Sequence, residues 1–251
     1  MVDALGWRKK FGVIAPSTNT SVEPEYARMQ PEGVTNHFSR VIIPDSPVTD
    51  DDSFVALVEN IRAATHDAID AVMTCQPGHV IMGMSAETFW DGAERADRLA
   101  AEFEERAGVD VTIGSHACQA AIDAYRQHTP IKTVGIITPY MPVGDKMVHR
   151  FFSDIGLDVL DVIGLKSPSP MLIAHETGER LREVTRQLDA LNPDAIIQCG
   201  TNLAYAHIAP EAERWLGKPV IAINTATYWH ALRKCGIKDQ MDGFGHLFSH
   251  H

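Results

Sequence analysis

The segment Asp194-Ala195-Ile196-Ile197-Gln198-Cys199-Gly200-Thr201-Asn202 decides how this chain is interpreted. Its apolar first half is typical of a buried strand, Gly200 and Thr201 turn the chain, and helical periodicity returns further on. Ligands bind at the carboxyl edge of open parallel sheets. We therefore expect the Cys199 thiol at such an edge, beside backbone N–H groups at a helix start that lower its pKa or hold a carboxylate. The alternative is a small buried hydrophobic residue.

Strand-like and helix-like segments alternate on both sides of this segment. The predicted strands cover 11–15, 37–43, 79–83, 109–113, 132–137, 157–162, 194–198 and 219–223. The predicted helices cover 53–71, 89–106, 117–127, 145–155, 176–191, 208–216 and 227–235. Strict alternation predicts an α/β fold with mostly parallel sheets flanked by helices.

The chain also resembles itself. Residues 12–16 match 135–139, residues 80–84 match 195–199, and residues 111–115 match 220–224, in the same order along both halves. The second match pairs Met84 with Cys199. Three ordered matches predict two pseudo-symmetric lobes with the active site in the cleft between them.

The predicted lobes meet with their strand ends face to face. We expect an N-terminal lobe over 1–130, completed by the C-terminal segment 225–251, and a C-terminal lobe over 131–224. The loops that would line the cleft are 16–19, 84–86, 139–140 and 199–202.

Composition narrows the function classes. The chain has 251 residues, 45% of them hydrophobic, and a formal net charge of −11. This charge argues against nucleic acid or a membrane surface as a partner. The four cysteines form no CxxC pair and the twelve histidines no HExxH motif, so we expect no metal. A reduced, cytoplasmic chain without signal peptide is the expectation, and Ala- and Leu-rich helix faces are compatible with a homo-oligomer.

Several motifs together resemble the aspartate/glutamate racemase superfamily, in particular its arylmalonate decarboxylase and maleate cis-trans isomerase branch. The resemblance spans nearly the whole chain, and the order and spacing of the motifs carry it. The motifs are Ala15-Pro16-Ser17-Thr18-Asn19-Thr20 with Glu23, Met82-Gly83-Met84-Ser85 with Phe89-Trp90-Asp91-Gly92, Thr138-Pro139-Tyr140, Cys199-Gly200, and Gly243-Phe244-Gly245-His246-Leu247-Phe248.

The resemblance implies Cys199 as the catalytic residue. Racemases and isomerases of this group carry a cysteine in both lobes, whereas the first-lobe position here is Met84, which has no exchangeable proton. The decarboxylases are similar to this chain in having only the second-lobe cysteine, although they carry a hydroxyl residue where this chain has Ala86. Decarboxylation of a substituted malonate-like diacid is therefore the main expectation.

The mechanism that the resemblance implies uses no metal and no organic cofactor. Donors hold one carboxylate, the other loses CO₂ in an apolar pocket, and Cys199 protonates the enediolate on one face. The expected donors are the hydroxyls of Ser85 and Tyr140 and the backbone N–H groups of Ala86, Cys199 and Gly200. Asn19 and Ser17 are expected as additional contacts, and Met84, with Phe89 and Trp90, as part of the apolar pocket.

Two alternatives stay open. One is a maleate-type cis-trans isomerase, in which Cys199 alone adds transiently to the double bond. The other is a non-catalytic carboxylate-binding relative with an inactive pocket. In all three cases the partner is a small carboxylate or dicarboxylate.

Overall fold

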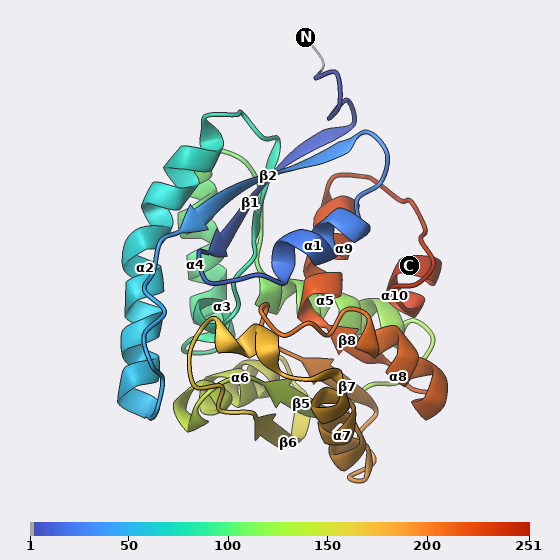
Figure 1. Ribbon diagram of the computed structural model, residues 1–251. Coiled ribbons are helices and arrows are strands. Elements are labelled where there is room, and N and C mark those ends of the chain that lie inside the picture. The colour runs from blue at the N-terminus through green and yellow to red at the C-terminus, as the bar shows by residue number, and fades with distance from the viewer. Residues whose placement is uncertain (1–2) are drawn as a thin grey trace.

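A computed structural model describes residues 3–251 and contains two four-stranded sheets (Figure 1). The strands of the first sheet are β1 (Lys9–Pro16), β2 (Val34–Val41), β3 (His79–Met82) and β4 (Val111–Thr112). Those of the second are β5 (Thr133–Thr138), β6 (Asp158–Gly164), β7 (Ala195–Gln198) and β8 (Val220–Ala222). The strand orders β2-β1-β3-β4 and β6-β5-β7-β8 are equivalent, and every pairing is parallel. The predicted two-lobe α/β fold is confirmed.

Helices cover both sheets and fill the space between them (Figure 1). Those up to the end of the first sheet are α1 (Val22–Arg28), α2 (Asp51–Met73), α3 (Ala86–Phe89), α4 (Ala93–Ala107) and α5 (Gly114–Arg126). The rest are α6 (Pro142–Asp154), the 3-10 helix η1 (Leu172–His175), α7 (Gly178–Asp189), α8 (Ile208–Leu216), α9 (Ile223–Lys234) and α10 (His246–His250).

Two helix predictions need correction. The single helix expected over 89–106 is broken, because Asp91 and Gly92 adopt positive φ angles of 60° and 85°, which end α3 and let α4 begin. The helix start expected beside Cys199 is also absent: residues 199–207 form turns, and α8 begins at Ile208. Any N–H groups offered near Cys199 therefore belong to a loop.

Strand register sets which residues of the two lobes correspond. The N–H of Gly83 donates to the carbonyl of Ile14 at 2.6 Å, and the N–H of Cys199 donates to that of Ile137 at 2.8 Å. Ile14 and Ile137 occupy the same place in the two matching first strands. Gly83 is therefore the counterpart of Cys199, and the predicted pairing of Met84 with Cys199 is wrong by one residue.

The corrected register has a consequence for the cleft. One step further along, Met84 corresponds to Gly200, and Ser85 corresponds to Thr201. The two lobes thus present a hydroxyl residue each, at equivalent positions after β3 and β7.

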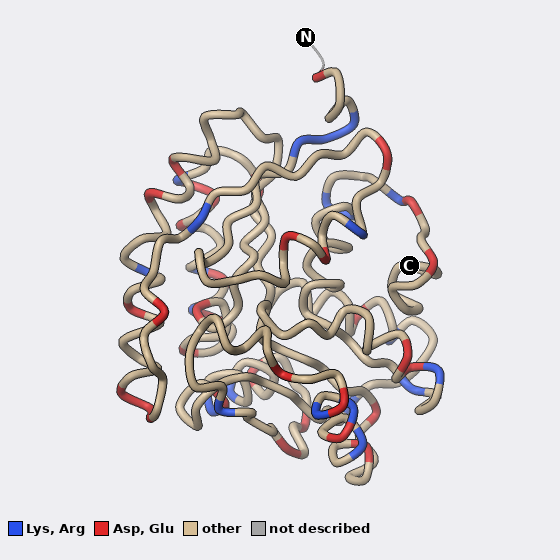
Figure 2. The backbone as a smooth tube through the Cα atoms, viewed as in Figure 1, with Lys and Arg blue, Asp and Glu red and all other residues tan. Residues whose placement is uncertain are grey.

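The C-terminal segment returns to the first lobe. α9 packs against α5, β3 and β4, and α10 packs against α5 and α9. The division at 130/131, with 225–251 completing the first lobe, stays a proposal that this packing supports. Charged residues of both signs are interspersed along the outer helices (Figure 2). No helix among residues 3–251 has the length and apolar character needed to cross a membrane.

Candidate active site

A small cavity of about 60 Å³ lies where the loops of the two lobes meet. It exceeds the roughly 10–15 Å³ that one water molecule needs. Among residues 3–251, no Lys, Arg, His, Asp or Glu lines it. Its lining residues are Pro16, Thr18, Asn19, Ile43, Phe54, Leu57, Ile61, Met84, Ser85, Ala86, Pro139, Tyr140, Pro170, Ile173, Gly200, Thr201 and Asn202.

Ser85 is the polar centre of this cavity. Its Oγ accepts a hydrogen bond from the Tyr140 hydroxyl at 2.7 Å and another from the Thr201 N–H at 3.1 Å. Because both bonds use the oxygen as an acceptor, the Ser85 hydroxyl proton remains free to donate to a ligand. One contact comes from the β5–α6 loop and the other from the β7–α8 loop, so the second lobe positions this first-lobe hydroxyl.

Two backbone donors lie beside Ser85. The N–H groups of Ala86 and Gly200 have no acceptor within the described residues, and both residues line the cavity. The Cys199 N–H, by contrast, is used in the bond to Ile137 and is not available to a substrate. Free donors around an uncharged cavity are suited to a carboxylate, which accepts several hydrogen bonds.

Asn19 and Asn202 connect the lobes at the cavity wall. The Asn19 amide donates to Thr201 Oγ1 at 3.2 Å, and its oxygen accepts from two N–H groups at the start of α1. The Asn202 oxygen accepts from the Thr20 N–H, and its amide donates to the Pro170 carbonyl, both at 2.9 Å. These amides fix the loops, and both residues line the cavity.

The structure brings most of the predicted site residues together, but not all. Asn19, Met84, Ser85, Ala86, Tyr140 and Gly200 line the cavity. Ser17 does not, because its hydroxyl bonds to the backbone of Ile43, donating to the carbonyl and accepting from the N–H, both at 3.1 Å. Cys199 is also absent from the lining.

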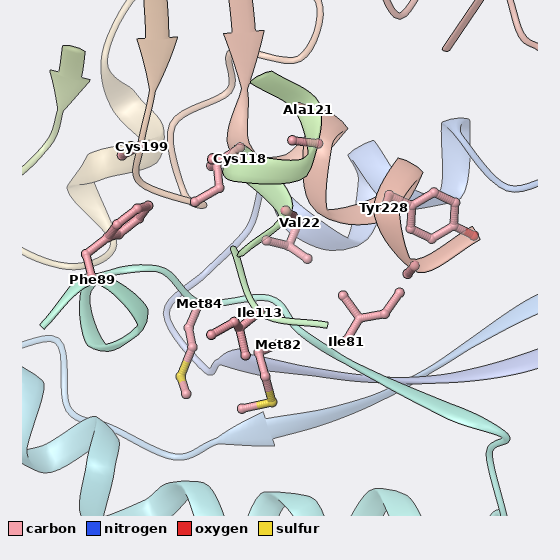
Figure 3. Close-up of a cluster of buried hydrophobic side chains, with 14 of the residues drawn as sticks. Val22, Ile81, Met82, Met84, Phe89, Ile113, Cys118, Ala121, Cys199 and Tyr228 are labelled. Atoms are coloured by element: carbon pink, nitrogen blue, oxygen red, sulfur yellow. The ribbon is translucent and has the colours of Figure 1, made fainter. Parts of the chain in front are cut away.

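Cys199 is fully buried, and its neighbour Gly200 lines the cavity instead. Burial raises the pKa of the Cys199 thiol well above the ordinary range, and the neighbouring thiol of Cys118 on α5 raises it further. Both cysteines belong to the same buried cluster as Phe89 and Met84 (Figure 3). In this arrangement the thiol is neutral and shielded, which is opposite to the lowered pKa expected from a helix start.

Asp145 holds the loop that carries Tyr140 through Thr138. The Thr138 hydroxyl donates to the Asp145 carboxylate and accepts from the Tyr140 N–H at 3.1 Å. Burial raises the pKa of Asp145 to about 6, and its bond from Thr138 opposes that rise. Burial also raises the pKa of Tyr140 well above 10, so its phenol stays protonated and donates to Ser85 at every physiological pH.

Sequence reasoning missed several members of the site. Thr201 and Asn202 fell in the predicted cleft loop without an assigned role, although their polar side chains directly after Gly200 were a signal. Phe54, Leu57 and Ile61 form an apolar wall from α2, and nothing in their helical spacing distinguished them from ordinary core residues.

Comparisons with known proteins place the chain in a family. The model of the arylmalonate decarboxylase family matches residues 11–248. Among curated proteins, the maleate isomerase of Alcaligenes faecalis is 27% identical and that of Geobacillus stearothermophilus 25% identical, each match covering 96% of this chain and 96–97% of the relative.

Solved structures share the fold. A mutant of the Nocardia farcinica maleate cis-trans isomerase with a covalently bound succinylcysteine intermediate superposes with a TM-score of 0.85 at 19% identity, covering 97% of this chain and 99% of that one. Unliganded arylmalonate decarboxylase superposes with a TM-score of 0.74 at 19% identity, covering 97% and 100%.

Proposed function

Because this chain belongs to the arylmalonate decarboxylase family, whose enzymes include decarboxylases and isomerases, we propose that it isomerises a maleate-like cis-enedioate to its trans isomer. The observation that carries the proposal is the near full-length similarity to the curated maleate isomerases. It favours the isomerase alternative over the decarboxylation that the single-cysteine pattern led us to expect. A small dicarboxylate is the substrate class under either reaction.

The cavity supports binding of one carboxylate by neutral donors. The Ser85 hydroxyl and the N–H groups of Ala86 and Gly200 are free to donate, and the remaining wall is mainly apolar. Donors in a water-poor cavity interact strongly with charge that develops during a reaction. The site is therefore suited to an enediolate, in which the carboxylate carries additional negative charge.

Isomerisation requires the carbon–carbon double bond to become single for a short time. A nucleophile adds to C2, and the electron pair of the double bond moves through C3 into the carboxylate attached to it. Rotation about the C2–C3 bond follows, and expulsion of the nucleophile restores the double bond in the trans form. The donor set around Ser85 would stabilise the intermediate between the two steps.

Cys199 stays our proposed nucleophile, since a thiol adds to an alkene far more readily than a hydroxyl without a neighbouring base. Its role has a structural requirement. The thiol must rotate from Cys118 toward the cavity when substrate binds and pass its proton to a carboxylate of the bound dicarboxylate, since no Lys, Arg, His, Asp or Glu among the described residues lines the cavity. The proton returns to the sulfur when the thiolate is expelled. The succinylcysteine captured in the Nocardia farcinica isomerase supports a cysteine adduct as an intermediate.

Proton NMR in deuterated water tests the function directly. Maleate should give fumarate without deuterium incorporation, because addition and elimination break no C–H bond. Substituted malonates should stay unchanged. Release of CO₂ from a malonate, with deuterium in the product and no fumarate from maleate, would overturn the proposal and restore decarboxylation. The homo-oligomeric state and the cytoplasmic location stay predictions.

A further inference from the structure

A buried carboxyl that the proposed chemistry does not use links α1 to the second lobe. Glu25 is 8% exposed. Its Oε1 accepts from the Ala206 N–H at 3.2 Å, and its Oε2 accepts from the Asn224 amide at 2.6 Å. Ala206 belongs to the loop after β7 and Asn224 to the first turn of α9, so one carboxyl connects three separate parts of the chain.

The Asn224 amide connects this carboxyl to the cavity. Its Nδ2 uses one hydrogen for Glu25 and the other for the Thr201 carbonyl, at 2.8 Å. The N–H of Thr201 in turn donates to Ser85 Oγ. The Asn224 Oδ1 is buried and has no partner among the described residues. A continuous set of contacts therefore runs from Glu25 to the central hydroxyl of the site, with one unused acceptor along it.

We propose that Glu25 is a positioning residue whose ionised carboxylate holds the Asn224 amide in the orientation that fixes Thr201, and whose protonation turns that amide over and releases Thr201. The inference concerns regulation of the same site, and in that respect it rests on the proposed function.

The chemistry of the amide gives the reason. An ionised Glu25 only accepts hydrogen bonds, so Asn224 must turn its NH₂ group toward it. A protonated Glu25 carries an O–H that needs an acceptor. Asn224 already bonds to Glu25 through its NH₂ group, and its Oδ1 is an acceptor without a partner among the described residues. Turning the amide satisfies that O–H and removes the donor from the Thr201 carbonyl. Thr201 then loses a contact that holds its N–H against Ser85.

The groups around Glu25 place the protonation of its carboxylate near neutral pH. Burial raises the pKa of Glu25 to about 7, opposed by the bonds from Asn224 and Ala206 and by the charge of Arg28 on the same helix. The phenols of Tyr26 on α1 and Tyr228 on α9 have raised pKa values and stay neutral in this range. The strand β2 also packs against α1, and its charged residue Arg40 forms a salt bridge with Glu23 of α1.

A histidine lies further away in the same region. His207, at the start of α8, has a pKa lowered first by burial and then by the nearby Arg182 and Arg28. Its charged form is therefore disfavoured where Glu25 titrates.

The first experiment compares pH profiles of maleate turnover. Glu25→Gln keeps the shape of the side chain, cannot ionise, and presents an NH₂ group that needs Asn224 Oδ1, so it imitates the protonated state. We expect wild-type kcat to rise through pH 7, and the variant to stay flat and about tenfold lower at pH 8, a loss within reach of a small misplacement in a site. KM should change less than kcat.

Glu213→Gln is the matched control. Glu213 is also a buried carboxyl, but its partners are the Tyr125 hydroxyl and the N–H groups of Val220 and His246, none of them in the Thr201 loop. This variant should keep the wild-type rise in kcat. A folded Glu25→Gln that keeps the rise, or an equal flattening in Glu213→Gln, overturns the inference.

A second measurement needs neither turnover nor a variant of Glu25. In protein labelled with ¹⁵N-threonine, the Thr201 amide resonance of the wild type should titrate near pH 7, and substitution of Thr201 by Ser identifies the signal. A Thr201 resonance that does not move between pH 6 and 8 overturns the inference whether or not maleate is a substrate. If the resonance titrates while maleate is not isomerised, the proposed function fails and the linkage stands.

Discussion

The Tyr140 hydroxyl donates a hydrogen bond of 2.7 Å to Ser85 Oγ, joining the lobes at the polar centre of the cavity. Tyr140 follows β5 and Ser85 follows β3, so the contact spans the two sheets. It orients the Ser85 proton toward the cavity, because the oxygen's acceptor sites are already occupied by Tyr140 and the Thr201 N–H.

The first prediction concerns these two hydroxyls. Ser85→Ala removes a donor to the developing enediolate, and we expect roughly a 100- to 1,000-fold loss in kcat, the range for loss of one such donor. Tyr140→Phe removes the group that orients Ser85, and the loss should be smaller. Both should lower kcat more than they raise KM, because the interaction strengthens in the transition state.

Steady-state kinetics with maleate measures the effect, and Ser153→Ala is the control, since that hydroxyl lies on the exposed side of α6. If Ser85→Ala and Tyr140→Phe raise KM alone, these residues are ordinary binding contacts, and the enediolate is stabilised elsewhere.

The fold was predictable because every long element carries its own pattern. The apolar strands and the amphipathic α2, α7 and α8 were each identified within a few residues. The seven-residue α1 was missed because it is too short to show helical periodicity and contains Pro24. The break at Asp91 and Gly92 depends on backbone angles that composition alone does not determine.

The site was harder to predict because it depends on register and on side-chain direction. Apolar strands look alike when shifted by one residue, so the matching runs paired Met84 with Cys199, and only the hydrogen bonds of Gly83 and Cys199 to the neighbouring strands resolve this. The direction of the Cys199 thiol follows from the packing of α5, which places Cys118 beside it. Glu25 and Asn224 lie 199 positions apart in sequence, and no local pattern connects them.

The second prediction concerns Cys199. Cys199→Ala should remove nearly all isomerisation and leave the fold intact, whereas Cys75→Ala, in the turn after α2, should be close to wild type. Iodoacetamide should label Cys199 slowly in the free enzyme, because its burial and raised pKa suppress the thiolate. Far-ultraviolet circular dichroism and turnover of maleate check the variants.

Wild-type turnover in Cys199→Ala would move the addition to Ser85, whose hydroxyl is the polar centre of the cavity. Ser85→Cys then provides the deciding measurement. Its thiol would face the cavity beside two hydrogen-bond donors that favour the thiolate, and intact-protein mass spectrometry with maleate would detect a covalent adduct.

The third prediction concerns Gly200, which has a φ of 110°. A Cβ at this position would lie 2.4 Å from Cδ of Pro139, in a backbone region that other residues rarely adopt. Gly200→Ala should lower the free energy of unfolding by roughly 2–6 kcal/mol, combining backbone strain with overpacking.

Gly217→Ala is the matched control for Gly200→Ala. Gly217 also has a positive φ, 68°, but a Cβ there meets nothing within 4 Å, so its cost should be only about 1–2 kcal/mol. Urea unfolding of both variants measures the difference. Equal losses would show that the approach of Pro139 to Gly200 does not constrain the loop.

The last prediction is the pH dependence of stability caused by Glu25. Its pKa is about 7 in the folded protein against an ordinary value of 4.5, so the folded state binds the proton more tightly than the unfolded state. Stability therefore falls as pH rises from about 4.5 to 7, and one such carboxyl accounts for about 3 kcal/mol over that window.

Glu25→Gln cannot titrate and lacks this contribution. Urea unfolding at pH 5 and pH 8 should thus show a smaller loss of stability in the variant than in the wild type. Comparing the two proteins cancels the parallel contribution of Asp145, whose pKa is also raised, to about 6. Equal losses in both proteins would mean that Glu25 ionises normally in the folded state, and that its bonds to Asn224 and Ala206 offset its burial.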